Sequence, residues 1–163
     1  MAAVDYFLKI DGIPGEATDH KHKDEIQLES FSWGETNSGT HAHSSGGGGA
    51  GKVQMQDFHF VMKVNKASPK LLLACATGQH IKEATLTCRK AGKDQQEYLK
   101  FKFNDLLISS YQTGGSGHSD VVPTDQISFN YSKIELEYKP QKADGTLDAG
   151  IKVNYDLAQQ KSH

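Results

Sequence analysis

The sequence has no long hydrophobic run and no excess of basic charge. Asp5, Lys9 and Asp11 interrupt its first residues, MAAVDYFLKID, so that these lack the apolar centre of a secretory signal. No stretch approaches the length of a membrane span. Lys and Arg number 18 against 20 Asp and Glu, a formal net charge of -2, which argues against nucleic acid or an anionic membrane as a partner. We therefore expect a protein that is made and folded in the cytoplasm.

Cysteine is also scarce. The chain of 163 residues contains two, Cys75 and Cys88, and in the cytoplasm both are expected to be reduced thiols that behave as small buried hydrophobes. A chain of this length buries enough apolar surface to fold without disulfides or a structural metal. No internal repeat or linker divides it, so residues 1–163 are expected to form a single domain.

Alternation of apolar and polar residues is the main pattern that is present, and it predicts β-strands. Alternating segments occupy residues 4–10, 25–33, 53–64, 84–89, 97–112, 127–138 and 151–157. In the segments 25–33, 97–112 and 127–138 the apolar residues change from one parity to the other midway. A flat sheet has no need of such changes, whereas strands that bend at the corners of a barrel do. We predict an all-β fold, a closed or tightly coiled barrel or sandwich of about seven or eight strands.

The segment SPKLLLACATGQ breaks the alternation and predicts one short flanking helix over about 68–78. Ser68 is a suitable N-cap, Pro69 a suitable first helical residue, and Gly78 a suitable C-terminal cap. The large apolar residues expected in the core are Phe31, Trp33, Phe58, Phe60 and Leu72.

The stretch GGGGAGKV, residues 46–53, has the glycine and lysine spacing of a nucleotide-binding P-loop. Such a loop needs an entering strand, a leaving helix whose amides meet the phosphates, and a Ser or Thr after the Lys. Here the entry HAHSS is polar and irregular, the exit VQMQDFHF alternates as a strand, and Val53 follows Lys52. The sequence therefore argues against a nucleotide-hydrolysing enzyme.

Other catalytic and metal-binding patterns are weak. His20 with His22, and His41 with His43, form His-x-His pairs in loop-like segments without a Cys or carboxylate at matching spacing. We interpret them as solvated surface histidines, with a metal site as the alternative. There is no G-x-S-x-G motif and no positioned Ser-His-Asp trio, and nothing selects a glycosidase pair of acids. We predict no enzyme activity, no cofactor and no metal.

Residues 37–52 contain almost no apolar side chain and are too numerous for a simple hairpin. Two interpretations remain open from the residues alone. The segment is a loose connection in a monomer, or it is an arm that becomes ordered against a neighbouring subunit, where glycines allow close approach of the backbone.

Several motifs together carry a resemblance to a known family. In chain order they are VDYFLKIDGIPGE, ESFSWG, GGGGAGKVQMQDFHF, SPKLLLACATGQH, LTCRKAG, EYLKFKFNDLLISSYQTGGSG, ISFNYSKIELEYKPQKADG and YDL. From Val4 to about Leu157 the chain resembles the haemolysin co-regulated protein family, the tube-forming component of type VI secretion systems. The resemblance implies a β-barrel with one flanking helix that assembles into hexameric rings around a wide channel.

The resemblance also implies partners and a route. Rings of this family stack into a tube inside a contractile sheath, a valine-glycine-repeat spike caps the tube, and some effectors travel in the channel. Contraction expels the tube from the cell or into a target cell in one step, without a signal peptide. The runner-up, from a different class, is a monomeric β-sandwich module that binds a ligand such as carbohydrate.

Two sets of site residues follow from the resemblance. Ser32, between Phe31 and Trp33, matches a position that faces the channel and affects effector binding. The segment 37–52 matches the family's extended loop, which contacts neighbouring subunits and the adjacent ring. Its candidate contact residues are Ser38, Gly39, His41, His43, Gly46, Gly47, Gly48, Gly49 and Gly51.

Overall fold

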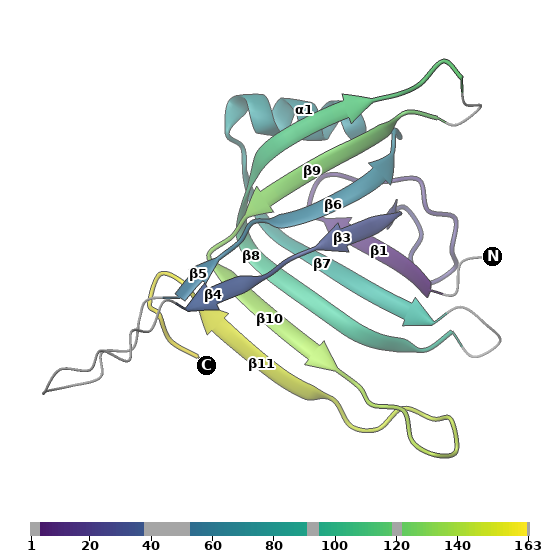
Figure 1. Cartoon of the computed structure of the whole chain (residues 1–163), viewed down its shortest axis with the longest axis vertical. Coiled ribbons are helices and arrows are strands. Elements are labelled where there is room, and N and C mark those ends of the chain that lie inside the picture. The colour runs from purple at the N-terminus through teal and green to yellow at the C-terminus, as the bar shows by residue number, and fades with distance from the viewer. Residues whose placement is uncertain (1–3, 38–52, 91–94, 119–121, 163) are drawn as a thin grey trace, which may run out of the picture.

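The computed structural model describes residues 4–37, 53–90, 95–118 and 122–162. These residues form eleven strands and one helix (Figure 1). The elements are β1 (Val4–Ile10), β2 (Ile26–Leu28), β3 (Ser30–Ser32), β4 (Glu35–Asn37), β5 (Val53–Met55), β6 (Phe58–Lys63), α1 (Ser68–Thr77), β7 (His80–Lys90), β8 (Glu97–Gly114), β9 (Thr124–Asn130), β10 (Lys133–Tyr138) and β11 (Ile151–Asp156).

Nine strands form one antiparallel sheet, and β4 and β5 form a separate pair. The main path runs β2-β1-β7-β8-β9-β6-β3. It begins and ends on consecutive strands, β2 and β3, with Glu29 between them, and the Glu29 N–H donates to the Val61 carbonyl of β6 at 2.8 Å. The sheet thus coils until its two ends meet on one stretch of chain, which confirms the predicted all-β fold.

The strands are more numerous than predicted because three alternating segments are divided and because β4 lies outside the predicted segments. The segments 25–33, 53–64 and 127–138 each give two strands. The break in 53–64 falls at Gln56, whose N–H donates to the Gly34 carbonyl at 2.9 Å and whose carbonyl accepts from the Tyr131 hydroxyl at 3.0 Å. These bonds replace sheet hydrogen bonds and turn the chain.

The three predicted changes of face are confirmed, and each falls at a bend. Asp105, with φ of 57°, separates buried Phe103 from buried Leu106 within β8. Glu29 separates β2 from β3. Between β9 and β10, Ser132 donates its N–H to the Asn104 carbonyl at 3.0 Å. Because β9 and β10 pair in turn with the same edge of β8, all of these strands bend around one core.

Aromatic rings fill that core. Phe58, Phe60, Phe103 and Phe129 are fully buried, and the centroids of Phe58, Phe103 and Phe129 lie 4.9 to 5.1 Å apart. Phe58 and Phe60 are thus core residues, as predicted.

Phe31 and Trp33 occupy the rim of the core rather than its centre. Both are half-buried and pack against it. Phe31 stacks on Phe58, with 5.8 Å between centroids, while Trp33 donates its Nε1–H to the Tyr131 hydroxyl. Burial raises the pKa of Tyr131 to about 12, so the hydroxyl stays protonated.

Helix α1 packs one stripe against the sheet. Leu71 and Ala74, three positions apart, are buried, whereas Leu72 is 52% exposed, so its prediction as a core residue was wrong. Neighbours on a helix point about 100° apart, and the apolar run LLL does not say which of its residues faces inward. The described residues contain no helix with the length and hydrophobicity to cross a bilayer.

Only the C-terminal end of α1 matches the prediction. Gly78 adopts φ of 65° and caps the helix through its N–H to the Ala74 carbonyl, as predicted. The N-cap is Ala67, not Ser68. Ser68 is buried instead and donates its hydroxyl to Asp125 Oδ2 at 2.6 Å, which ties the helix to β9.

Both cysteines are free thiols. Cys88 is buried in β7, and burial raises its pKa to about 12, as expected for a small hydrophobe without nucleophilic character. Cys75 is half-buried on α1.

Candidate interaction surfaces

The secondary structure that follows the glycine run is not that of a P-loop. Val53 begins strand β5 directly after the lysine, so a strand rather than a helix follows. Residues 46–52 and the other loop candidates, Ser38, Gly39, His41 and His43, lie outside the described residues. Within the part of the chain that the structure describes, no group of three or more His, Cys, Asp or Glu residues is arranged to hold a metal ion.

Ser32 lies on a polar face of the sheet. Strand pairing places it opposite His59, which pairs with Ser128, which in turn pairs with Ser110. The neighbouring row holds Ser30, Val61, Gln126 and Gln112. Ser30, Ser32, His59 and Gln126 are exposed. Alternation along the strands turns this polar face away from the phenylalanine core.

The hydroxyl groups of this polar face bond to one another. Ser128 is buried, and its hydroxyl lies 3.0 Å from that of Ser109 and also contacts that of Ser110. Ser109 donates to Asp57 Oδ2 at 2.6 Å at the margin of the face. The two cross-strand rows contain no Lys, Arg, Asp or Glu, so this part of the face offers hydrogen bonds without fixed charge.

Strands β10 and β11 present a second, apolar face. Register pairs Tyr138 with Ile151 and Leu136 with Val153. Ile151 is 65% and Val153 59% exposed. We call the face formed by Leu136, Tyr138, Ile151 and Val153 the apolar strip. β11 pairs only with β10 among the described strands, so the strip ends at an open edge.

The opposite face of β10 and β11 is charged. Lys152 Nζ lies 3.6 Å from Glu135 Oε1, and Lys139 Nζ lies 4.0 Å from Glu137 Oε1. One face of this pair of strands is charged, whereas the other is apolar and is left exposed by the described residues. An apolar sheet face of this kind is usually buried by another layer or by a partner protein.

An apolar groove of about 600 Å³ adjoins the strip. On one side stands the arm, the two-stranded sheet β4–β5, which projects from the body at the end that also carries the C-terminus (Figure 1). Trp33, Val53 and Met55 line the groove from the arm side, and Leu136, Val153 and Tyr155 from the other. The groove and the strip together form a continuous apolar surface.

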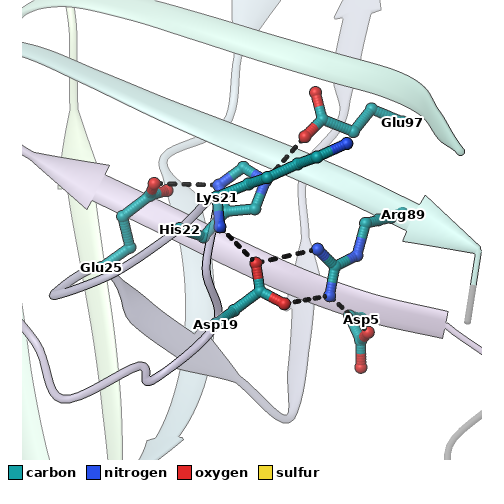
Figure 2. Close-up of polar contacts among 7 residues, drawn as sticks. All are labelled: Asp5, Asp19, Lys21, His22, Glu25, Arg89 and Glu97. Carbon is teal, nitrogen blue, oxygen red and sulfur yellow. Dashed lines mark hydrogen bonds and ion pairs between the residues drawn. The ribbon is translucent and has the colours of Figure 1, made fainter. Parts of the chain in front are cut away.

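A buried ionic cluster lies between β1, β7 and the loop 11–25 (Figure 2). Arg89 is 2% exposed, and its Nη1 and Nη2 donate to the two Asp19 carboxylate oxygens at 3.0 and 2.8 Å. Nη2 also donates to Asp5 Oδ2 at 3.1 Å, and the guanidinium carbon lies 4.8 Å from the Phe7 ring centroid. The hydrogen bonds from Arg89 hold the pKa of Asp19 well below its usual value, although burial acts in the opposite direction.

His22 belongs to the same cluster, which corrects its prediction as a solvated surface residue. It is 7% exposed and stacks on Phe7, with 4.5 Å between ring centroids. Its Nδ1 lies 2.8 Å from Glu25 Oε2 and its Nε2 lies 2.7 Å from Glu97 Oε1. His20 is exposed, as predicted, and His41 and His43 lie outside the described residues. Glu25, three positions after His22, is a local signal for the contact in the sequence.

Comparisons with known proteins match the chain to one protein family. A family model described as "Type VI secretion system effector, Hcp" matches residues 7–138. Protein hcp1 of Pseudomonas aeruginosa is 43% identical over 159 residues, covering 96% of this chain and 97% of that protein.

Solved structures agree with the family match. The crystal structure of Hcp1 from Salmonella typhimurium superposes with a TM-score of 0.79 at 33% identity, over 99% of this chain and 100% of that one. A structure described as a type six secretion system protein gives a TM-score of 0.91 at 32% identity with the same coverage.

Proposed function

The chain belongs to the Hcp family of type VI secretion system proteins, and we propose that it is a structural tube subunit that assembles into hexameric rings. In this proposal the rings stack into a tube inside a contractile sheath and carry effectors in the channel. The subunit acts through its shape and surfaces and performs no catalysis. It assembles in the cytoplasm, and sheath contraction expels it together with a valine-glycine-repeat spike.

The observation that carries the proposal is the apolar strip with its groove. A monomeric protein rarely leaves residues such as Ile151 and Val153 exposed side by side at the open edge of a sheet. In the proposed ring, the strip meets a different surface of the neighbouring subunit. Head-to-tail contacts of this kind close into rings when the rotation between subunits allows it.

The polar face supports a role as channel wall. A channel that carries proteins in water has to be wet and free of strong charge, because fixed charges would retain cargo of the opposite sign. The rows around Ser32 and His59 supply hydroxyl, imidazole and amide groups without Lys, Arg, Asp or Glu. We therefore assign Ser32 to the wall of the channel.

Substitution of Val153 tests the ring contact. Val153→Asp places a charge in the apolar strip, where burial against a neighbour would be unfavourable. We expect a folded subunit that elutes as a monomer and forms no rings by negative-stain electron microscopy. Lys152→Gln is the matched control, because it also lowers the net charge by one but lies on the charged face, and it should leave rings intact. Rings formed by Val153→Asp as readily as by the parent protein would overturn the assignment.

Substitution of Ser32 tests the channel wall. Ser32→Gln adds bulk to the polar face without adding charge, so rings should form normally while small effectors are retained less well. Ser32→Ala, which removes the hydroxyl without adding bulk, separates the effect of size from that of hydrogen bonding. Effector levels in cells that do not change with Ser32→Gln would count against a channel position.

The glycine-rich segment is assigned to contacts between subunits and between rings. Strands β4 and β5 bring its two ends together at the tip of the arm, away from the sheet core. Deletion of Ser44 to Gly51 should leave a folded subunit and impair stacking. Tubes that form from the deleted protein under the parent's conditions would contradict this role.

The alternative function, a monomeric module that binds a small ligand, is favoured by the same groove. It predicts that the parent protein remains a single subunit over a wide range of concentrations. Size-exclusion chromatography with imaging of the parent protein therefore distinguishes the two functions.

A further inference from the structure

The contacts of His22 place a carboxylate oxygen beside each of its two ring nitrogens. A neutral imidazole has one N–H and one lone pair, so it donates to a single acceptor. Here each nitrogen lies within hydrogen-bond distance of a carboxylate oxygen, 2.8 Å from Glu25 and 2.7 Å from Glu97. In a neutral ring, the lone pair of one nitrogen would face a carboxylate at this distance, which is repulsive. The imidazolium satisfies both.

We propose that His22 is a proton-operated latch that holds the loop 11–25 against the start of β8. In the protonated state His22 donates to Glu25 within the loop and to Glu97 of β8, 75 positions further along the chain. Loss of one proton removes one of the two bonds, so that the ring no longer links Glu25 and Glu97 and the loop is held less firmly against β8. The latch is independent of the ring contact, since it acts within one subunit.

The charges around the ring favour this state. The nearby charged side chains come from the loop itself, from β1, from β7 and from β8; they are Asp19, Lys21, Glu25, Asp5, Lys9, Asp11, Glu83, Arg89 and Glu97. Arg89 is occupied by Asp19 and Asp5. Glu25 and Glu97 are thus the carboxylates that contact the imidazole, as Figure 2 shows, and two negative groups stabilise a positive ring.

Other bonds keep the loop folded when the latch opens. Ala17 donates its N–H to the Glu25 carbonyl at 3.0 Å, Gly15 donates to the Asp24 carbonyl at 2.8 Å, and Asp19 is held by Arg89. Release therefore loosens the loop rather than unfolding the subunit. The loop lies on the side of the subunit away from the arm (Figure 1), so the change is confined to that side.

The direction of the pH effect follows from the charge on the ring. Both hydrogen bonds need a proton on each ring nitrogen, so the stabilisation is lost once one of these protons has been removed. The loop is thus held more firmly in mildly acidic than in alkaline solution.

Hydrogen exchange and the nitrogen chemical shifts of the His22 ring test the latch on the full-length protein. We expect both ring nitrogens to carry protons at about pH 6. After correction for intrinsic exchange, protection of the Ala17 and Asp24 amides should fall about tenfold as the ring deprotonates. The variant His22→Gln should show no such dependence, whereas the control His20→Gln, two residues away and exposed, should behave like the parent protein.

A second variant keeps the test informative if His22→Gln folds poorly. Glu97→Gln retains an acceptor but removes the charge, so the loop should loosen at a lower pH than in the parent protein. A singly protonated ring at about pH 6 would overturn the latch. So would an identical loss of protection in His22→Gln, or an unchanged pH profile in Glu97→Gln.

Discussion

The phenylalanine core and the apolar strip are both made by alternating strands, yet the residues that the structure describes cover only one of them. Phe58, Phe103 and Phe129 are 0% exposed, because the sheet coils around them. Ile151 and Val153, on the same kind of strand, are 65% and 59% exposed. Both regions have the period of two that predicts a strand with one apolar face. The comparison teaches that alternation indicates which face needs covering and leaves open which chain covers it.

The two regions also differ in how the strands end. In the core, bends at Asp105 and Glu29 let strands pass from one neighbour to the next, so each apolar face meets another. β11 has no second partner among the described strands. The polar face around Ser32 is largely exposed as well, but its hydroxyl, imidazole and amide groups can form hydrogen bonds with one another and with solvent. An exposed polar face is stable alone, whereas an exposed apolar strip is stabilised by association.

The largest expected effect is a difference in unfolding free energy between a substitution in the core and one in the apolar strip. Phe103→Ala removes a fully buried ring that contacts several others, and it should lower the free energy of unfolding by about 3 to 5 kcal/mol. Ile151→Ala should change it by about 0.5 kcal/mol or less in the isolated subunit. Denaturant unfolding has to be measured at concentrations where rings are dissociated, since assembly would stabilise both proteins. Equal losses of unfolding free energy in the two variants would contradict this distinction between core and strip.

Two substitutions on α1 test the same contrast between a covered and an exposed apolar residue within one helix. Leu71 is fully buried and Leu72, the next residue, is 52% exposed. Leu71→Ala should cost about 2 to 5 kcal/mol of unfolding free energy. Leu72→Ala should cost about 0.5 kcal/mol or less. A large loss for Leu72→Ala in dissociated subunits would show that the helix presents a different stripe to the sheet.

Much of the fold could be predicted from the sequence because local patterns determine it. The parity changes in 25–33, 97–112 and 127–138 each mark a bend of the backbone, and Gly78 marks the end of the helix. The inward stripe of α1 could not be read from the run LLLACA, because its apolar residues surround most of the helix. The tertiary bond of Ser68 to Asp125 likewise replaced the local cap that the sequence favoured.

The candidate site was less accessible to sequence analysis. The environment of His22 depends on Glu97 and Phe7, which lie far away along the chain, so a His-x-His pair in a polar loop indicated only surface histidines. The apolar strip was visible as alternation, but its exposure is a property of the folded subunit. Ser32 could be placed opposite the core by alternation, whereas the role proposed for it came from the family resemblance.

The smallest expected effect on the free energy of unfolding comes from two charge pairs, one buried and one exposed. Asp19→Asn leaves Arg89, which is 2% exposed, with Asp5 as its remaining carboxylate, and should lower the free energy of unfolding by about 1.5 to 3 kcal/mol at neutral pH. Glu135→Gln breaks the exposed pair with Lys152 and should change it by about 0 to 1 kcal/mol. Because Arg89 lowers the pKa of Asp19 in the folded state, the stabilisation is complete well above the unfolded value of about 3.9 and is lost as the pH falls below it. The curves of stability against pH for Asp19→Asn and the parent protein should therefore converge in acid. A gap that stays constant down to about pH 2 would mean that the loss comes from packing and not from ionisation.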